Sequence, residues 1–338
     1  TMTAKQYDVA VLGATGAVGE AILDILASRG FPVRNLYPLG SAGEVVSFRG
    51  REVSVLDVGQ FDFSRVQIVF SAADEAVAAV HAPRAAAAGC VVIDSTAGFR
   101  DEPDVPLVVP EVNPHAIARY RARNIIASPG GAAILLAVAL KPIHDAVGVV
   151  RINVATYQSV SGTGKEAIEE LAQQTIALFN QREIEVEVYP KRIAFNLLPQ
   201  IDGVQANGYT GEEMEMVREI RKILEDEAIL VNPTAVRVPV FFGQAQAVHI
   251  ETRRKVTAGE AREMLDKAPG VAVMDERTPG GYPTPLEATG EDAVFVGRIR
   301  EDISHPLGLD LWVVSDNMRK GAALNSVQIA EILIEKYL

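Results

Sequence analysis

The chain has 338 residues, enough for two domains of about 150 residues each, and its 48% hydrophobic and 22% charged residues are typical of a globular protein. Lys and Arg number 32 against 44 Asp and Glu, and this net charge of -12 argues against nucleic acid as a partner. One cysteine excludes an internal disulfide, and five scattered histidines predict no metal site. The polar start and the lack of an apolar run of about 18 residues predict no secretory signal and no membrane partner, so we expect a cytoplasmic protein.

In the first part of the chain, short apolar runs alternate with helical patterns, as in a doubly wound α/β domain. The run 9–12 predicts a strand, and the spacing of Val18, Ile22 and Ile25 predicts a helix directly after it. The units that follow are a strand at 66–70, an Ala-rich helix at 75–88, and strands at 90–94 and 124–127. This pattern predicts a Rossmann-like dinucleotide-binding domain with a parallel sheet.

After residue 145 the pattern changes to longer alternating strands separated by helices. The strands are expected at 151–159 and 234–242, and the helices at 164–181 and 211–227. This predicts a second, α+β domain for substrate and dimerisation. We place the dinucleotide-binding domain at 1–130, completed by a C-terminal helix at 321–338, and the second domain at 131–320.

Three glycines with the spacing Gly-x-x-Gly-x-x-Gly stand between the first strand and the first helix, at Gly13, Gly16 and Gly19. Glycines permit a tight turn and close backbone approach, and the N–H groups of a helix N-terminus can bind a pyrophosphate. We therefore predict a dinucleotide site, with a purely structural turn as the alternative. The stretch 36–43 has no acid for a ribose 2′-hydroxyl and no Arg for a 2′-phosphate, which leaves NAD or NADP open.

Blocks spread over nearly the whole chain resemble those of the aspartate-semialdehyde dehydrogenase family. They are GATGAVG at 13–19, SAG at 41–43, GFRDEPDVPLVVPEVN at 98–113, TYQSVSGTGK at 156–165, NGYTGEEMEM at 207–216, RVPV at 237–240, YPTP at 282–285 and SDNMRKGAALNSVQIAE at 315–331. The resemblance implies a homodimer, an NADP-binding domain and reductive chemistry on an acyl phosphate in amino-acid biosynthesis. The cofactor-binding residues that it implies are Gly13, Thr15, Gly16, Ala17, Val18, Ser41, Asn317 and Gln328.

The two main catalytic groups of the family are replaced in this chain. The resemblance implies a cysteine nucleophile in a block NPNCST, which corresponds to 128–133 and puts Gly131 at the position of the thiol. Glycine has no side chain that could form a thioester. The family's acid/base histidine corresponds to Gln244, which cannot exchange a proton near neutral pH. We expect Cys90 to be a buried core thiol and His249 a sheet-face residue, with substitute nucleophile and substitute base as the respective alternatives.

Several binding contacts of the family are kept, and one is reversed in charge. The resemblance implies that Arg100 contacts phosphate, that Arg237 grips a carboxylate, and that Gln158 is retained from the catalytic centre. Its Glu-x-x-Lys pair corresponds to Glu212, implied to bind substrate, and Glu215. The phosphate site has therefore lost a cation.

Helical spacing brings Glu219 onto the same face as these two glutamates, and we predict that this face repels phosphate, with a solvated acidic face as the alternative. At the nucleotide, the family's arginine is Gly40, its serine is Pro38, and its Asn-Ser-Ser stretch is 95–97. These changes predict a weakened grip on a 2′-phosphate.

We interpret the chain as an aspartate-semialdehyde dehydrogenase homologue, most similar to the Usg-type paralogues, that lacks thiol-dependent activity. It is expected to act as a ligand-binding or regulatory pseudoenzyme that binds NADP or NAD and a small carboxylate. The alternatives are an NAD(P)-dependent oxidoreductase acting on another carbonyl, and weak aspartate-semialdehyde dehydrogenase activity in amino-acid biosynthesis.

Overall fold

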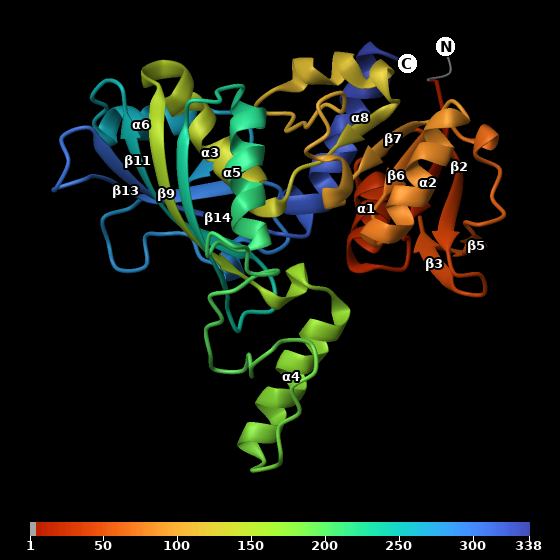
Figure 1. Cartoon of the computed structure of the whole chain (residues 1–338), viewed down its shortest axis with the longest axis horizontal. Coiled ribbons are helices and arrows are strands. Elements are labelled where there is room, and N and C mark those ends of the chain that lie inside the picture. Colours follow the sequence, from red (N-terminus) through yellow and green to blue (C-terminus); the bar gives the residue numbers. More distant parts are fainter. Residues whose placement is uncertain (1–4) are drawn as a thin grey trace. The chain divides into compact units, whose positions relative to one another are not determined.

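The computed structural model describes residues 5–338, which form two compact units (Figure 1). The first unit runs to Gly130 and resumes at Ala322–Leu338, and the second spans Gly131–Gly321. These limits differ by one residue from the boundaries proposed at 320 and 321. The roles of the two domains remain a proposal.

A parallel six-stranded sheet with the order β5-β2-β1-β6-β7-β8 forms the centre of the first unit. Its strands are β1 (Tyr7–Leu12), β2 (Val33–Gly40), β5 (Leu56–Asp57), β6 (Ile68–Ser71), β7 (Val91–Asp94) and β8 (Ile125–Ala127). The strands β1, β6 and β7 are buried along their whole length, which explains their continuous apolar runs. The predicted Rossmann-like fold is confirmed.

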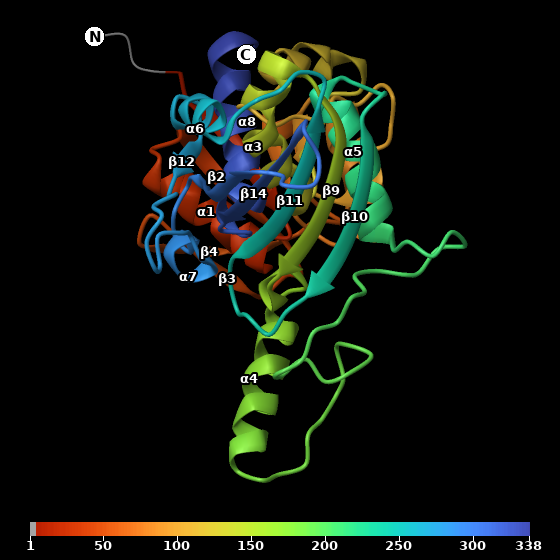
Figure 2. The same ribbon diagram turned by 90° about the vertical axis from the view of Figure 1, so that its left-hand side faces the viewer.

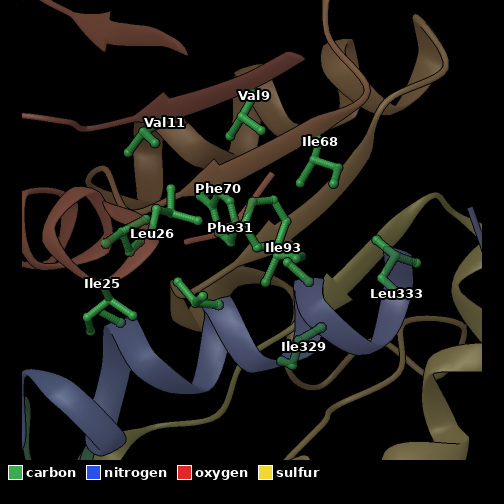
Figure 3. Close-up of a cluster of buried hydrophobic side chains, with 14 of the residues drawn as sticks. Val9, Val11, Ile25, Leu26, Phe31, Ile68, Phe70, Ile93, Ile329 and Leu333 are labelled. Atoms are coloured by element: carbon green, nitrogen blue, oxygen red, sulfur yellow. The ribbon is translucent and has the colours of Figure 1, made fainter. Parts of the chain in front are cut away.

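Helices cover both faces of this sheet, and the last helix of the chain completes the core. They are α1 (Ala17–Ser28), α2 (Glu75–Ala87) and α8 (Leu324–Lys336), and a small hairpin of β3 (Val45–Phe48) and β4 (Arg51–Ser54) lies near α1. Figure 3 shows Phe70 and Ile93 of the sheet near Ile329 and Leu333 of α8. The C-terminal helix is therefore part of the first unit's hydrophobic core.

The strand order places a crevice at the carboxyl ends of β1 and β6. From β1 the strand order continues through β2 toward one edge of the sheet, and from β6 it continues through β7 toward the opposite edge. Ligands of open α/β sheets bind where the strand order reverses in this way. The glycine-rich turn after β1 lies at this position.

A mixed six-stranded sheet with the order β10-β9-β11-β14-β13-β12 forms the second unit (Figure 2). Its strands are β9 (Val149–Gln158), β10 (Leu230–Arg237), β11 (Gln244–Thr252), β12 (Val271–Val273), β13 (Val294–Glu301) and β14 (Gly308–Ser315). Its helices are α3 (Gly131–Val147), α4 (Lys165–Phe179), α5 (Gly211–Leu224), α6 (Ala258–Asp266) and α7 (Pro285–Ala288). The helix α3 contacts four of the strands as well as α5 and α6, so these three helices cover one face of the sheet.

Some element ends differ from the sequence prediction. The strand expected at 234–242 begins earlier and ends at Arg237, because Pro239 has no N–H group to continue the ladder. The final helix begins at Leu324 rather than residue 321, after a π-helical turn at Arg319–Ala323. Among the described residues, no helix is long and apolar enough to cross a membrane.

The α8 core generates a stability prediction. Ile329 is completely buried, so Ile329→Ala should lower the free energy of unfolding by about 2–5 kcal/mol through lost burial and a cavity. Urea unfolding followed by circular dichroism measures the change. Val80→Ala is the control, because Val80 is 58% exposed on α2 and should change stability by less than about 0.5 kcal/mol. Equal effects of the two variants would contradict the role given to α8.

Candidate functional site

A cavity of about 640 Å³ opens at the carboxyl ends of β1, β2, β5 and β6 in the first unit. Its lining residues are Leu12, Gly13, Thr15, Gly16, Gly40, Ser41, Ala42, Glu44, Asp57, Val58, Ala72, Ala73, Asp74 and Val77. The structure thus brings four of the proposed cofactor residues together, and two more, Ala17 and Val18, open α1 beside them. The cavity lies where a dinucleotide-binding fold holds its ligand.

The three glycines of the turn have different physical reasons to be glycine. A Cβ on Gly13 would lie 2.6 Å from the backbone nitrogen of Ala73, and one on Gly19 only 2.1 Å from the carbonyl oxygen of Gly13. Packing therefore excludes a side chain at both. At Gly16 the nearest atom would be 3.4 Å away, an ordinary contact, so packing alone does not require glycine there.

Gly16 is the N-cap of α1, and no side chain caps this helix. A ligand that needs close approach to the first N–H groups of α1 explains a glycine at the cavity wall. The residues present therefore fit the pyrophosphate of a dinucleotide.

Three acidic residues are among those that line the cavity, and the sequence analysis did not predict them. The parallel register pairs Gly40 at the end of β2 with Asp57 at the end of β5. Glu44 and Asp74 also line the cavity. The strand β5 is only two residues long and exposed, so it has no hydrophobic periodicity that could have placed Asp57 beside β2.

Arg100 lies in the first unit and connects the ends of two strands. Its Nε donates to the carbonyl oxygen of Ser128 at 3.2 Å, and its Nη2 donates to that of Ser95 at 2.9 Å. Nearby, burial raises the pKa of Asp94, while hydrogen bonds from Thr96 and the charge of Arg100 act in the opposite direction. The guanidinium of Arg100 therefore has a structural role in addition to the phosphate contact that the resemblance implies.

In the second unit, three proposed site residues lie in one row across the sheet. The register pairs Arg237 of β10 with Gln158 of β9, and Gln158 in turn with Gln244 of β11. Partners in register point to the same face of a sheet, so these three side chains are neighbours. Glu212 of α5 joins the row, because its Oε1 accepts a hydrogen bond of 2.9 Å from Gln158 Nε2.

Gly131 and Gln244, where the resemblance places the thiol and the base, face each other. A Cβ on Gly131, the first residue of α3, would lie 3.5 Å from Gln244 Oε1 and 3.0 Å from the carbonyl oxygen of Gly321. Gln244 is 3% exposed, and its Nε2 makes no hydrogen bond within residues 5–338. The adjacent Gln246 donates to the carbonyl oxygen of Ala132 at 2.8 Å, but its Oε1 also has no partner in that range. Unpaired buried amide atoms are costly and are expected to meet a ligand or a water.

Arg237 is the buried cation of this row. It is 6% exposed, and its Nη1 donates to the carbonyl oxygen of Ser159 at 2.8 Å. Its Nε makes no hydrogen bond to any described residue. Burial lowers the pKa of the guanidinium, and Tyr189 and Glu212 oppose this effect. A guanidinium with a buried, unpaired N–H can bind a carboxylate.

Asn317 has an extensive role inside the second unit. Its Oδ1 accepts from the N–H of Gly243 at 2.8 Å and from the hydroxyl of Ser161 at 3.2 Å. Its Nδ2 donates to Ser161 Oγ at 2.9 Å. Gln328, which the resemblance also implies as a cofactor-binding residue, lies half-buried on α8 of the first unit. Their roles in cofactor binding stay predictions.

The acidic face of α5 is not simply solvated. Glu219 is 2% exposed, and Glu212 and Glu215 are half-buried. Together with the contact between Glu212 and Gln158, this burial favours an acidic lining over a solvent-facing surface. That this face disfavours phosphate stays a prediction.

Neither Cys90 nor His249 has the surroundings expected of a substitute nucleophile or base. The thiol of Cys90 is completely buried and contacts the carbonyl oxygens of Phe63 and Val66, and burial raises its pKa to about 11. His249 lies five residues after Gln244 in β11 and therefore points to the opposite face of the sheet, where its Nδ1 is 3.0 Å from Asp310. Within residues 5–338, no three acidic, His or Cys side chains form a metal site.

The fold and the cavity define an NAD(P)-binding α/β protein with a second, mixed-sheet domain, and comparisons with known proteins narrow this class. The chain matches the semialdehyde dehydrogenase NAD binding domain over residues 8–120 and the semialdehyde dehydrogenase dimerisation domain over 140–320. The chain belongs to the aspartate-semialdehyde dehydrogenase family.

Full-length relatives support this membership. The chain is 56% identical to an aspartate-semialdehyde dehydrogenase of Legionella pneumophila, over 99% of this chain and 97% of the relative. It is 57% identical to that of Shewanella sp. strain DB6705, over 98% and 99%. The crystal structure of aspartate semialdehyde dehydrogenase II of Vibrio cholerae, complexed with ASA, is 52% identical with a TM-score of 0.97, over 99% and 100%.

The surroundings of Cys90 generate a reactivity prediction. With a pKa of about 11, only about one thiol in a thousand is ionised at pH 8, and burial excludes the reagent as well. Ellman's reagent should therefore label the native chain at least about a hundredfold more slowly than the chain unfolded in guanidinium. The unfolded chain serves as the control for one reactive thiol. Rapid labelling of the native chain would reopen Cys90 as a nucleophile.

Proposed function

We propose that this chain binds a nicotinamide dinucleotide in its first unit and a small carboxylate in its second, and that it lacks the thiol-dependent oxidation of aspartate semialdehyde. The observation that carries this proposal is the pairing of Gly131 with Gln244, which leaves neither a thiol nor an imidazole where the resemblance places them. The covalent route needs a thiolate to form a thioester and a proton carrier to assist it. A pseudoenzyme that binds its ligands without this route is the function that these residues support best.

The remaining polar groups of the second unit suit binding and orientation. The charge of Arg237 and its unpaired Nε attract a carboxylate, and the row through Gln158 and Gln244 offers amide groups to a polar ligand. Glu212 holds Gln158 in place and can accept a hydrogen bond from an amino group. A bound NAD or NADP would supply a hydride acceptor or donor, and this chain would hold its pyrophosphate at Gly16 and the start of α1.

A second candidate function is retained dehydrogenase activity. The names of relatives at 56% and 57% identity favour it over a pseudoenzyme. In this chain it would need a nucleophile other than Gly131, or hydride transfer to another carbonyl without a covalent intermediate. With such activity, the chain would act in amino-acid biosynthesis, as the family resemblance implies.

Three narrower assignments also stay proposals. The match to a dimerisation domain supports a homodimer. Membership of the Usg-type paralogues rests on the two replaced catalytic residues. A cytoplasmic location is consistent with a biosynthetic family.

An activity assay separates the two functions. The purified chain should show no phosphate-dependent oxidation of aspartate semialdehyde above a control without enzyme, because no thiol can form the acyl intermediate. Reduction of NAD or NADP is followed by the rise in absorbance of the reduced nicotinamide at about 340 nm. Turnover by the native chain would establish the second function instead.

Variants then test the positions of the two groups. Gly131→Cys and Gln244→His should each stay near background, because groups that act as a unit restore little when restored singly. The Cβ of Gly131→Cys also needs the carbonyl of Gly321 to shift, since it would lie 3.0 Å away. Large activity of Gln244→His alone would show that the thiol is supplied from elsewhere.

The row in the second unit generates a ligand prediction. Small dicarboxylates such as succinate should bind more tightly than inorganic phosphate, because the planar guanidinium of Arg237 matches a carboxylate group. Phosphate concentrates its charge in one compact group beside the α5 glutamates, whereas succinate places its two charges at separate ends. Isothermal titration calorimetry measures both. Arg237→Ala should weaken succinate binding by about tenfold to a hundredfold, the effect of losing a charge-assisted hydrogen bond.

Three further variants serve this test. Arg151→Ala is the matched control, because Arg151 is exposed on the opposite face of β9 and should leave binding unchanged. Arg237→Lys keeps the charge and should weaken succinate binding less than alanine does. Glu215→Lys should strengthen phosphate binding more than succinate binding, because succinate is held mainly through Arg237. Phosphate preference in the native chain would contradict the proposed site.

A further inference from the structure

We propose that the cavity of the first unit selects NAD over NADP, because Asp57 and Glu44 favour a ribose diol and disfavour a 2′-phosphate. This inference rests on the dinucleotide binding proposed above and names the cofactor for that same cavity. It departs from the NADP that the family resemblance implies, and the chain's own residues carry the departure.

The first observation is the pairing of β2 with β5. In a dinucleotide-binding fold the residue that reads the ribose lies at the carboxyl end of the second strand. Here that strand ends at Gly40, which has no side chain, and the register places Asp57 directly beside it. Figure 1 shows the strands β2 and β5 next to each other. A carboxylate therefore lies beside Gly40, the position at which the resemblance implies an arginine.

The second observation is the hydrogen bonding of Asp57. Its Oδ1 accepts the N–H of Gly59 at 2.8 Å, which orients the carboxylate. Its Oδ2 makes no hydrogen bond within residues 5–338 and can accept one from a hydroxyl group. A ribose with a free 2′-hydroxyl offers such a donor, whereas a 2′-phosphate offers only acceptors at neutral pH.

The third observation is the charge of the cavity wall. Its ionisable lining residues are Glu44, Asp57 and Asp74, and within the described part of the chain no Lys, Arg or His lines it. Arg84 does not line the cavity, but its Nη1 donates to the carbonyl oxygen of the lining residue Val58 at 3.3 Å. The guanidinium of Arg84 is also held by the carbonyl oxygen of Phe61, at 3.2 Å.

These observations act in the same direction. A 2′-phosphate adds nearly two negative charges to a cavity lined by three carboxylates, and none of the described lining residues is a cation that compensates them. Because the wall is open to solvent, salt screens this repulsion, while the hydrogen bond from the diol to Asp57 depends little on salt. The preference for NAD should therefore be largest at low ionic strength and persist in part at high ionic strength.

The test is a binding measurement on the full chain. Dissociation constants for NADH and NADPH are measured by the change in nicotinamide fluorescence and checked by calorimetry, at low and at high salt. NADH should bind at least about tenfold more tightly at low salt. AMP and 2′-phospho-AMP, which contain only the adenosine end, should show the same order.

Variants assign the preference to its residues. Asp57→Asn keeps an oxygen for Gly59 but removes the charge, and together with Glu44→Gln it should reduce the preference to about threefold or less. Gly40→Arg should strengthen NADPH binding, since its Cβ would lie 3.3 Å from Val55 Cγ1 and needs only a small shift. Asp24→Asn removes an equal charge from an exposed position on α1 outside the cavity and should change neither constant.

The outcomes separate this inference from the function on which it rests. If neither NADH nor NADPH binds, dinucleotide binding itself is refuted. If NADPH binds as tightly as NADH or more tightly, the cavity binds a dinucleotide but does not select NAD. An unchanged preference in the double variant of Asp57 and Glu44 would likewise overturn the role of these acids.

Discussion

The close backbone packing at the carboxyl end of β1 is the constraint on which the first unit depends. Gly13 passes within van der Waals distance of the turn after β6, and Gly19 packs against the carbonyl of Gly13, so a side chain at either would push the elements apart. This packing draws β1, α1 and the loop after β6 together around one cavity. The turn is therefore structural and ligand-binding at once, and the two explanations of its glycines do not exclude each other.

Fold and chemistry are carried by different residues in this family member. The core of the first unit is built from the sheet, α1 and α8, and that of the second from its sheet and α3. None of these contacts requires a thiol at residue 131 or an imidazole at residue 244. A chain with glycine at 131 and glutamine at 244 therefore keeps a TM-score of 0.97 to the crystal structure of a family member. A similar fold is for this reason weak support for activity, which depends on the residues of the site.

The second unit contains a row of polar side chains near Gly131. Arg237, Gln158 and Gln244 still form a row across three neighbouring strands. Buried atoms of Arg237 and Gln244 have no partners among residues 5–338, a cost that a purely structural site would be expected to avoid. These unpaired groups are therefore expected to meet a ligand or a water.

The sequence by itself determined the Rossmann-like fold and the family, and it generated the prediction that Gly131 and Gln244 replace a thiol and a histidine. Local patterns carry these features: apolar runs, helical spacing, and motifs such as the glycine turn at 13–19. It also indicated that Cys90 is a core thiol, because the residue opens an apolar run. The tertiary structure alone decided which charges share a cavity. Asp57 meets Gly40, and Gln244 faces Gly131, through strand register and helix packing that join residues far apart in the chain, and no local pattern encodes such contacts.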